Sequence, residues 1–157
     1  MTFIDLATAK AHLRVTHDAE DTLIGLYLSA AENAAVAALD RKVYADSGDL
    51  NAAVAAAPFV FEAAVENYSS AVFEARAIAD TATQAEALRV AELAFQRAKI
   101  ESRQVNDGIV INDAITAAVL LTLGHLYDNR SDVVSGLSVA ALPNGADALL
   151  QPYRVYA

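Results

Sequence analysis

The segment from Ile115 to Leu126 constrains the fold most, because it is apolar on nearly every face of the helix that it would form. A helix that is apolar all round is buried among other helices. The run is well short of the ~20 residues that a membrane-spanning helix needs. The sequence therefore predicts a buried central helix, capped by Asn112 and ending near Asn129. Its large apolar residues are Ile115, Val119, Leu120, Leu121, Leu123 and Leu126.

The composition favours helices along the whole chain. Hydrophobic residues make up 55% of the 157 residues, and only six Gly and three Pro interrupt them. Many of the hydrophobic residues are Ala, which loses little entropy in a helix. There is no Cys, so disulfides and thiolate metal sites are excluded. We expect an all-α fold with a single domain, residues 1–157, built as a helical bundle around the central helix.

Two helices are predicted before residue 45. Asp5 can cap a short helix over residues 6–13, and Asp18 can cap a longer one that runs to about Leu39. Apolar residues at spacings of three and four predict which face of the longer helix is buried. These residues are Leu23, Tyr27, Ala30, Ala34 and Ala38.

Residues 50–105 form a long Ala-rich helical stretch. An Ala-rich piece is predicted to stop at Pro58, and helical spacing then continues to about Val105. Two coiled-coil-like seams that are out of phase favour two antiparallel helices with a turn near residues 80–83, and one long helix with a stutter is the alternative. The first seam is Phe61, Val65, Tyr68, Val72, Ala75 and Ala79, and the second is Leu88, Ala91, Phe95, Ala98, Ser102 and Val105.

Short extended segments flank the central helix. Residues 109–111 follow an Asn-Asp-Gly turn and are a candidate arm of a small hairpin. After a loop, a short helix over residues 146–150 is closed by Pro152, and residues 153–156 form an extended aromatic tail. Two interpretations of this tail stay open: it packs back on its own domain, or it docks on another chain by adding a strand or filling a groove.

The charges and motifs argue against an enzyme. A net charge of −9 and a pI of about 4.6 make tight nucleic-acid binding improbable. The three His residues form no metal-binding pattern, and the start of a calcium loop at Asp128, Arg130 and Asp132 lacks its Gly and Glu. These three residues instead suggest helix-end solvation or inter-subunit ion pairs. No nucleophile or phosphate-binding motif occurs, so we expect no catalytic residue, cofactor or metal, and, without a signal peptide or membrane span, a cytoplasmic origin.

The apolar helix ends in the motif His-x-Tyr-x-Asn-Arg, and the motifs Leu-Pro and Leu-Leu-x-Pro-Tyr-Arg follow after a loop. In these motifs and in its N-terminal region the chain resembles the head–tail connector (adaptor, or head completion) proteins of tailed bacteriophages. The N-terminal region that resembles that of the family reads AKAHLRVTHDAEDTLIGLYLSAAENAA. The resemblance covers roughly residues 1–44 and 112–157. Its C-terminal residues are His125, Tyr127, Asn129, Arg130, Leu142, Pro143, Leu149, Leu150, Pro152, Tyr153 and Arg154.

The resemblance implies a structural role in the neck of a phage, prophage or gene transfer agent particle that is assembled in the bacterial cytoplasm. Such connectors form a ring, usually of twelve copies, which extends the DNA channel between the portal protein and the stopper or tail. DNA would pass an acidic bore without sequence-specific binding. The implied portal-docking residues are Gln151, Pro152, Tyr153, Arg154, Val155 and Tyr156, and the candidate inter-subunit residues are Asp128, Asn129, Arg130 and Asp132.

The middle of the chain departs from the resemblance, because residues 50–105 are longer and more helical than this region is in most such connectors. A generic helical interaction or scaffold module, whose residues 58–105 bind a partner helix, is therefore the alternative function. In isolation we expect a monomer or a weak oligomer, since rings formed before the portal is met would assemble in the wrong place.

Overall fold

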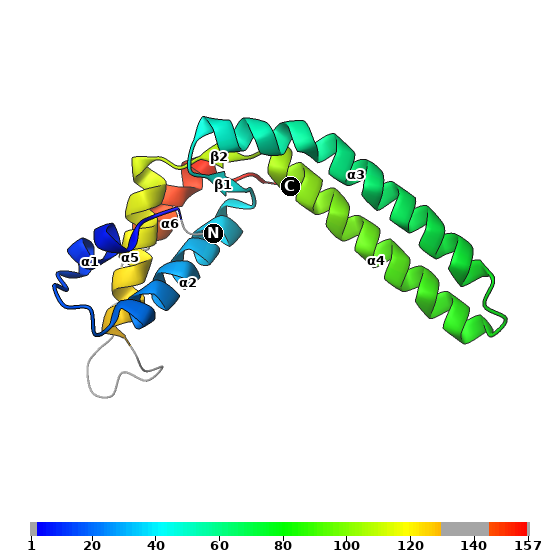
Figure 1. Cartoon of the computed structure of the whole chain (residues 1–157), viewed down its shortest axis with the longest axis horizontal. Helices are drawn as coiled ribbons and strands as arrows, with labels where there is room; N and C mark the ends of the chain where they lie inside the picture. The colour runs from blue at the N-terminus through cyan, green and yellow to red at the C-terminus, as the bar shows by residue number, and fades with distance from the viewer. Residues whose placement is uncertain (1–2, 130–144, 157) are drawn as a thin grey trace. The chain divides into compact units, whose positions relative to one another are not determined.

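The computed structural model describes residues 3–129 and 145–156, and its fold is predominantly all-α, as predicted (Figure 1). Contacts divide the chain into two compact units: the core unit, Met1–Asp46 with Ile109–Ala157, and the hairpin unit, Ser47–Gly108. The single-domain organisation stays a prediction. The elements are α1 Leu6–Leu13, α2 Asp21–Leu39, β1 Val43–Tyr44, α3 Ser47–Arg76, α4 Thr81–Asn106, β2 Ile109–Val110, α5 Asp113–Asp128, α6 Gly145–Leu150 and the 3₁₀ helix η1 Gln151–Tyr153.

The core unit is built around α5, which packs against α1, α2 and α6. This confirms the predicted central helix, and Ile115, Val119 and Leu123 are fully buried on it. Leu121 is the exception, because 48% of it is exposed. The side chains that meet α5 come mainly from α2, and they are Ile24, Leu28, Ala31, Ala35 and Leu39.

The buried stripe of α2 is therefore one residue out of phase with the predicted stripe, which was wrong. Ala30 and Ala34 are exposed, whereas Ala31 and Ala35 are buried. Because Ala occupies both faces of the second half of this helix, the spacing of small apolar residues alone does not determine the phase. The larger Ile24 and Leu28 fix which face turns to α5.

Two of the three predicted caps are confirmed. The carboxylate of Asp5 accepts a hydrogen bond from the Thr8 amide at 2.6 Å, and Asn112 accepts one from the Ile115 amide at 3.0 Å. The prediction for Asp18 was wrong, because α2 begins at Asp21 and has no side-chain cap.

Strands β1 and β2 form a two-stranded parallel ladder, in which Val43 pairs with Ile109 and Tyr44 with Val110. The predicted antiparallel hairpin arm was wrong. Parallel neighbours cannot be joined by a tight turn and need a long crossover connection. The hairpin unit is that connection, since the chain leaves the core unit after β1 and returns to it at β2.

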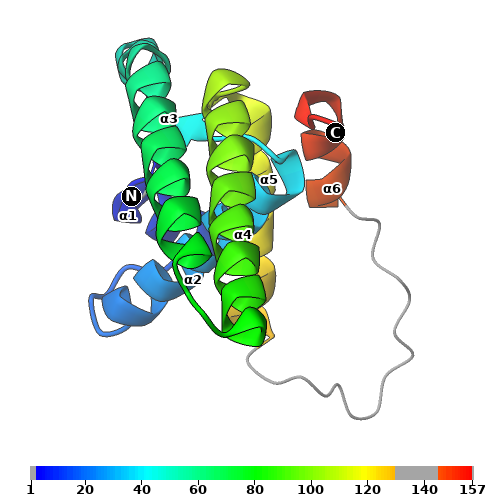
Figure 2. The same ribbon diagram turned by 90° about the vertical axis from the view of Figure 1, so that its right-hand side faces the viewer.

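In the hairpin unit, α3 and α4 lie side by side as two helices, which confirms the favoured prediction over one long helix (Figures 1 and 2). Asp80 caps α4 by accepting the Thr83 amide at 2.7 Å. The Phe95 ring stacks on Tyr68 with ring centroids 4.8 Å apart and lies 5.9 Å from Phe61. Residues of both predicted seams thus meet at this contact.

Pro58 lies inside α3, which corrects the prediction that the Ala-rich piece stops there. Proline removes one helical hydrogen bond and normally kinks or ends a helix. Here α3 continues through the proline and lies along α4. Ala57 and Phe61, on either side of the proline, line a hollow together with Ala98 and Ser102 of α4.

Two helices, α2 and α3, are long and apolar enough by length and composition to cross a membrane. The core helices of globular domains meet the same criterion, and α2 supplies much of the core of its unit. By contrast α3 buries little of itself, so its apolar side chains lie mostly at the surface.

Glu32 is a buried carboxylate in the middle of α2, with 3% of the residue exposed. One of its oxygens accepts the backbone N–H groups of Phe3 and Ile4 at 2.9 and 3.0 Å. Glu32 thereby ties the segment before α1 to the core. Burial raises the pKa of Glu32 above 4.5, against the opposite effect of the hydrogen bonds from Ile4 and Phe3.

Glu32→Ala is expected to destabilise the core unit by about 1–3 kcal/mol, because it leaves two backbone N–H groups without an acceptor. Glu32→Gln keeps an acceptor oxygen and should cost less. Because the folded chain binds the Glu32 proton more tightly than the unfolded chain, this carboxyl contributes stability below about pH 4.5 that is lost as the pH rises through its folded pKa. Urea unfolding of the wild type and Glu32→Gln at pH 4.5 and 7 tests this, and an equal pH dependence in both would contradict it.

Candidate functional site

The C-terminal segment lies against the C-terminal end of α2. The Arg154 side chain donates from Nε to the Ala38 carbonyl at 2.5 Å, and the Val155 amide donates to the Leu39 carbonyl at 3.0 Å. Carbonyls in the last turn of a helix have no partner within the helix. A cation there also interacts favourably with the helix dipole. Residues 154 and 155 therefore cap α2 from far along the chain.

Two further contacts fix this segment within the core unit. Arg41, just beyond α2, donates to the Tyr153 carbonyl at 3.1 Å. Arg154 also forms an ion pair with Asp147 of α6, with 3.3 Å between nitrogen and oxygen. The segment is thus tied both to the end of α2 and to α6.

The predicted docking residues differ in how much of each residue is exposed to solvent. Gln151 and Pro152 are exposed, whereas Tyr153, Arg154 and Val155 are partly buried. Tyr156 is exposed over 72% of its surface. The contacts of residues 153–155 agree with the interpretation that the tail packs on its own domain, but they leave an aromatic ring at the surface. Docking of this segment on another chain stays a prediction.

The second predicted group lies at the end of α5. Asn129 donates from its amide and from Nδ2 to the His125 carbonyl, at 3.0 and 2.9 Å, so it caps the helix. Asp128 and His125 are both exposed on the last turn. Arg130 and Asp132 lie outside the described residues. Inter-subunit contacts by this group also stay a prediction.

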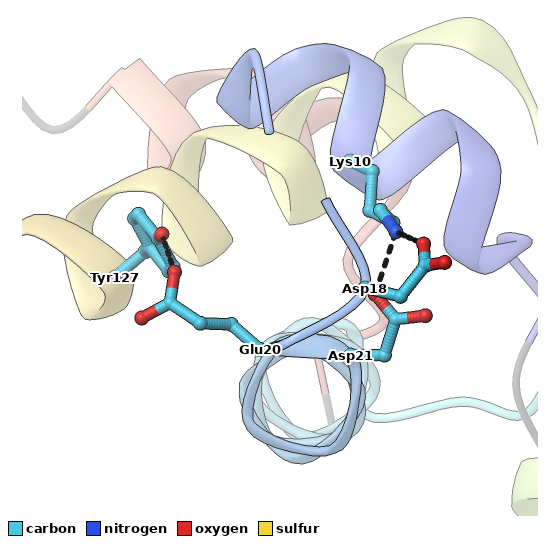
Figure 3. Close-up of polar contacts among 5 residues, drawn as sticks. All are labelled: Lys10, Asp18, Glu20, Asp21 and Tyr127. Atoms are coloured by element: carbon cyan, nitrogen blue, oxygen red, sulfur yellow. Dashed lines mark hydrogen bonds and ion pairs between the residues drawn. The ribbon is translucent and has the colours of Figure 1, made fainter. Parts of the chain in front are cut away.

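A polar cluster that sequence reasoning missed holds the connection between α1 and α2 (Figure 3). Lys10 Nζ lies 2.6 Å from Asp18 and 2.7 Å from Asp21. The hydrogen bond from Lys10 lowers the pKa of Asp18. The Tyr127 hydroxyl donates to the carboxylate of Glu20, which joins this connection to the last turn of α5.

Within residues 3–129 and 145–156, no group of three or more His, Asp or Glu side chains is placed to hold a metal ion. A hollow of about 500 Å³ between α2, α5 and α6 is lined mainly by apolar and small residues, with His125 and Asp147 at its polar side. The hydrogen bonds of the tail join it to the backbone carbonyls of Ala38 and Leu39 and to the side chain of Arg41.

A comparison with protein families gives a match over most of the chain. The model of the family described as phage gp6-like head-tail connector protein matches residues 3–102. The matched range includes α1, α2 and α3 and most of α4, and it ends before α5 and the C-terminal segment. No match was found among curated proteins or among solved structures.

Proposed function

The chain belongs to the phage gp6-like head-tail connector family, and from this we propose that it forms a ring beneath the portal protein, usually of twelve copies, and joins the capsid to the stopper or tail. A head-tail connector is a structural component of the phage virion neck. The family match over residues 3–102 is the observation that carries the proposal. A phage, a prophage remnant or a gene transfer agent would use the ring in the same way.

The anchored C-terminal segment supports docking on the portal. Binding by a free tail costs conformational entropy, and prior ordering of the tail reduces that cost. Here Arg154 and Val155 hold the backbone against α2, whereas Tyr156 is left exposed. An exposed aromatic ring on a fixed support is a typical interface anchor. We propose residues 151–156 as the portal-docking segment and Asp128, Asn129, Arg130 and Asp132 as a contact between ring neighbours.

The charge of the chain is compatible with a DNA channel. A net charge of −9 per chain is repeated by every copy in a ring. Like charge along the bore disfavours the phosphate contacts that would hold DNA, so DNA passes without sequence-specific binding. We further propose that the two units act as one connector domain, assembled in the bacterial cytoplasm, into which the hairpin unit is inserted.

The test is to mix the purified chain with the portal protein of the same particle and examine the mixture by electron microscopy and native mass spectrometry. The expected result is a ring of this chain on the portal. The chain alone, at micromolar concentration in a sizing experiment, is expected to be a monomer or a weak oligomer. Absence of a ring on the portal would overturn the proposed function.

A helical interaction or scaffold module is the second candidate. The exposed apolar side chains of the hairpin unit favour it, because they are available to a partner whether or not a portal is present. A hairpin unit that binds a host or phage protein while no ring forms on the portal would support this alternative.

A further inference from the structure

The hairpin unit buries very little. Its buried residues among those described are Ala57 and Ala75 on α3 and Ala91 on α4, all small. Large apolar side chains lie outside instead: Phe59 is 72% exposed and Phe73 is 79% exposed. Single exposed apolar residues are normal on a protein surface, so the charges beside these rings are needed to identify an interface.

The outer face of α3 points directly away from α4. Phe59 is two residues after buried Ala57, and Phe73 is two residues before buried Ala75. Two residues turn a helix by about 200°, so both rings lie opposite the contact with α4. Glu62 and Glu66 lie between them on this face. We call Phe59, Glu62, Glu66 and Phe73 the acidic face.

The outer face of α4 has the opposite charge. Leu93 is two residues after buried Ala91, and Ile100 follows it by seven residues on the same side. They are 43% and 50% exposed. Arg89 lies four residues before Leu93 and pairs with Glu86 of the same face at 2.5 Å, so Arg97, between the two apolar residues, supplies the positive charge without a partner among the described residues. We call Arg89, Leu93, Arg97 and Ile100 the basic face.

We propose that the acidic face of one copy binds the basic face of the next copy, so that the hairpins stand side by side around the ring. This inference rests on the proposed function, because it assumes a ring. Each hairpin carries the two complementary faces on opposite sides, which is the arrangement that a head-to-tail contact needs in order to close. Apolar contacts at the centre and opposite charges beside them are typical of a specific interface.

The register inside the hairpin indicates which residues meet. Phe95 contacts both Phe61 and Tyr68, so it lies level with residues 64–65 of α3. Counting along the antiparallel helices, Phe59 is then level with Ile100 and Glu62 with Arg97. In a cyclic ring every copy stands at the same height, so these levels also apply between neighbours. Among the described residues, neither Glu62 nor Arg97 forms an ion pair within its own chain.

Other occupants fit these faces less well. A lipid bilayer would have to take up Glu62 and Glu66 between the two Phe rings, and carboxylates are costly in hydrocarbon. A symmetric contact between two copies of α3 would place the same acids against each other. The head-to-tail contact instead places Glu62 level with Arg97 and Glu66 level with Leu93.

Cysteine trapping tests the contact directly, because the chain has no Cys of its own. The variant carries Glu62→Cys and Arg97→Cys, which leaves the apolar residues of both faces in place. The matched control carries Glu62→Cys and Arg89→Cys. Arg89 lies eight residues, about 12 Å, along α4 from Arg97, which is beyond the reach of a disulfide. Each variant is mixed with the portal protein, oxidised, and run on a denaturing gel without reductant.

The expected result is a ladder of covalent multimers for the first variant and monomer for the control. Equal ladders in both would overturn the register, and no ladder in either would overturn the contact. Dimers formed by Glu62→Cys alone would show the symmetric contact and contradict the proposal. Electron microscopy of the same mixtures distinguishes failure of this contact from failure of the proposed function. Rings without a ladder reject this contact and leave the proposed function standing, whereas absence of rings rejects both.

A charge exchange gives an independent readout. Glu62→Arg or Arg97→Glu alone is expected to weaken self-association by about fivefold, since each places like charges across the contact. The double exchange should restore it. Native mass spectrometry of mixtures with the portal protein, over a concentration series of this chain, measures this, together with flotation on phosphatidylcholine vesicles. Failure of the double exchange to restore association, or binding to the vesicles, would count against the proposed pair.

Discussion

Leu123→Ala is expected to lower the free energy of unfolding of the core unit by about 3 kcal/mol. Leu123 is fully buried on α5, the helix against which α1, α2 and α6 pack. Truncation of a buried Leu removes its transfer free energy and leaves a cavity, and the usual cost is about 2–5 kcal/mol. Chemical denaturation followed by circular dichroism measures the change, and native mass spectrometry should show weaker assembly on the portal.

Leu121→Ala is the matched control for this prediction. It makes the same substitution two residues earlier on the same helix, where 48% of the side chain is exposed. The expected cost is below about 1 kcal/mol, because much less surface is transferred back to water. Similar losses in the two variants would show that α5 is not the centre of the core unit.

The parts of the fold that follow from local chemistry could be predicted from the sequence. Asp5 and Asn112 cap their helices through contacts three residues away, so a short window contains the whole interaction. The uniformly apolar α5 could be assigned to the centre for the same reason. The two seams of the hairpin were also visible, because Phe95 and Tyr68 are large and regularly spaced.

The errors concern contacts between distant residues. Asp18 has the properties of a helix cap but binds Lys10 of the preceding helix instead. The parallel pairing of β1 with β2 joins segments that are separated by the whole hairpin unit, so no local pattern indicates it. In α2, Ala on adjacent faces made two phases equally acceptable, and packing on α5 decided between them.

For the candidate site, the sequence indicated which segment to consider but not how that segment is held. The aromatic ending singled out residues 153–156, and the resemblance supplied a role for them. The anchoring contacts, in which Arg154 caps the end of α2, join residues more than 100 positions apart. An Arg within a short tail gives no sign in the sequence of which helix end it will reach. The structure thus separates two roles within one segment, anchoring and exposure, that the sequence could not separate.

This separation leads to the prediction with the largest effect on assembly. Tyr156→Ala is expected to change the free energy of unfolding by less than about 0.5 kcal/mol, because the side chain is 72% exposed. Loss of the Tyr156 aromatic side chain as an interface anchor should weaken portal binding by about 2 kcal/mol, roughly thirtyfold. Urea unfolding and binding to immobilised portal protein measure the two effects on the same sample.

Arg154→Ala, in contrast to Tyr156→Ala, is expected to lower the free energy of unfolding as well as portal binding. Loss of the donor to the Ala38 carbonyl and of the pair with Asp147 is expected to cost about 1–3 kcal/mol of stability, and portal binding should weaken because the tail is no longer held. Arg154→Lys keeps the charge at the end of α2 but not the planar guanidinium, so it should lie between the two. If Tyr156→Ala bound the portal as the wild type does, the Tyr156 side chain would not be part of the docking contact. Loss of binding in Arg154→Ala alone would then assign the segment a purely structural role, as a clamp between α6 and α2.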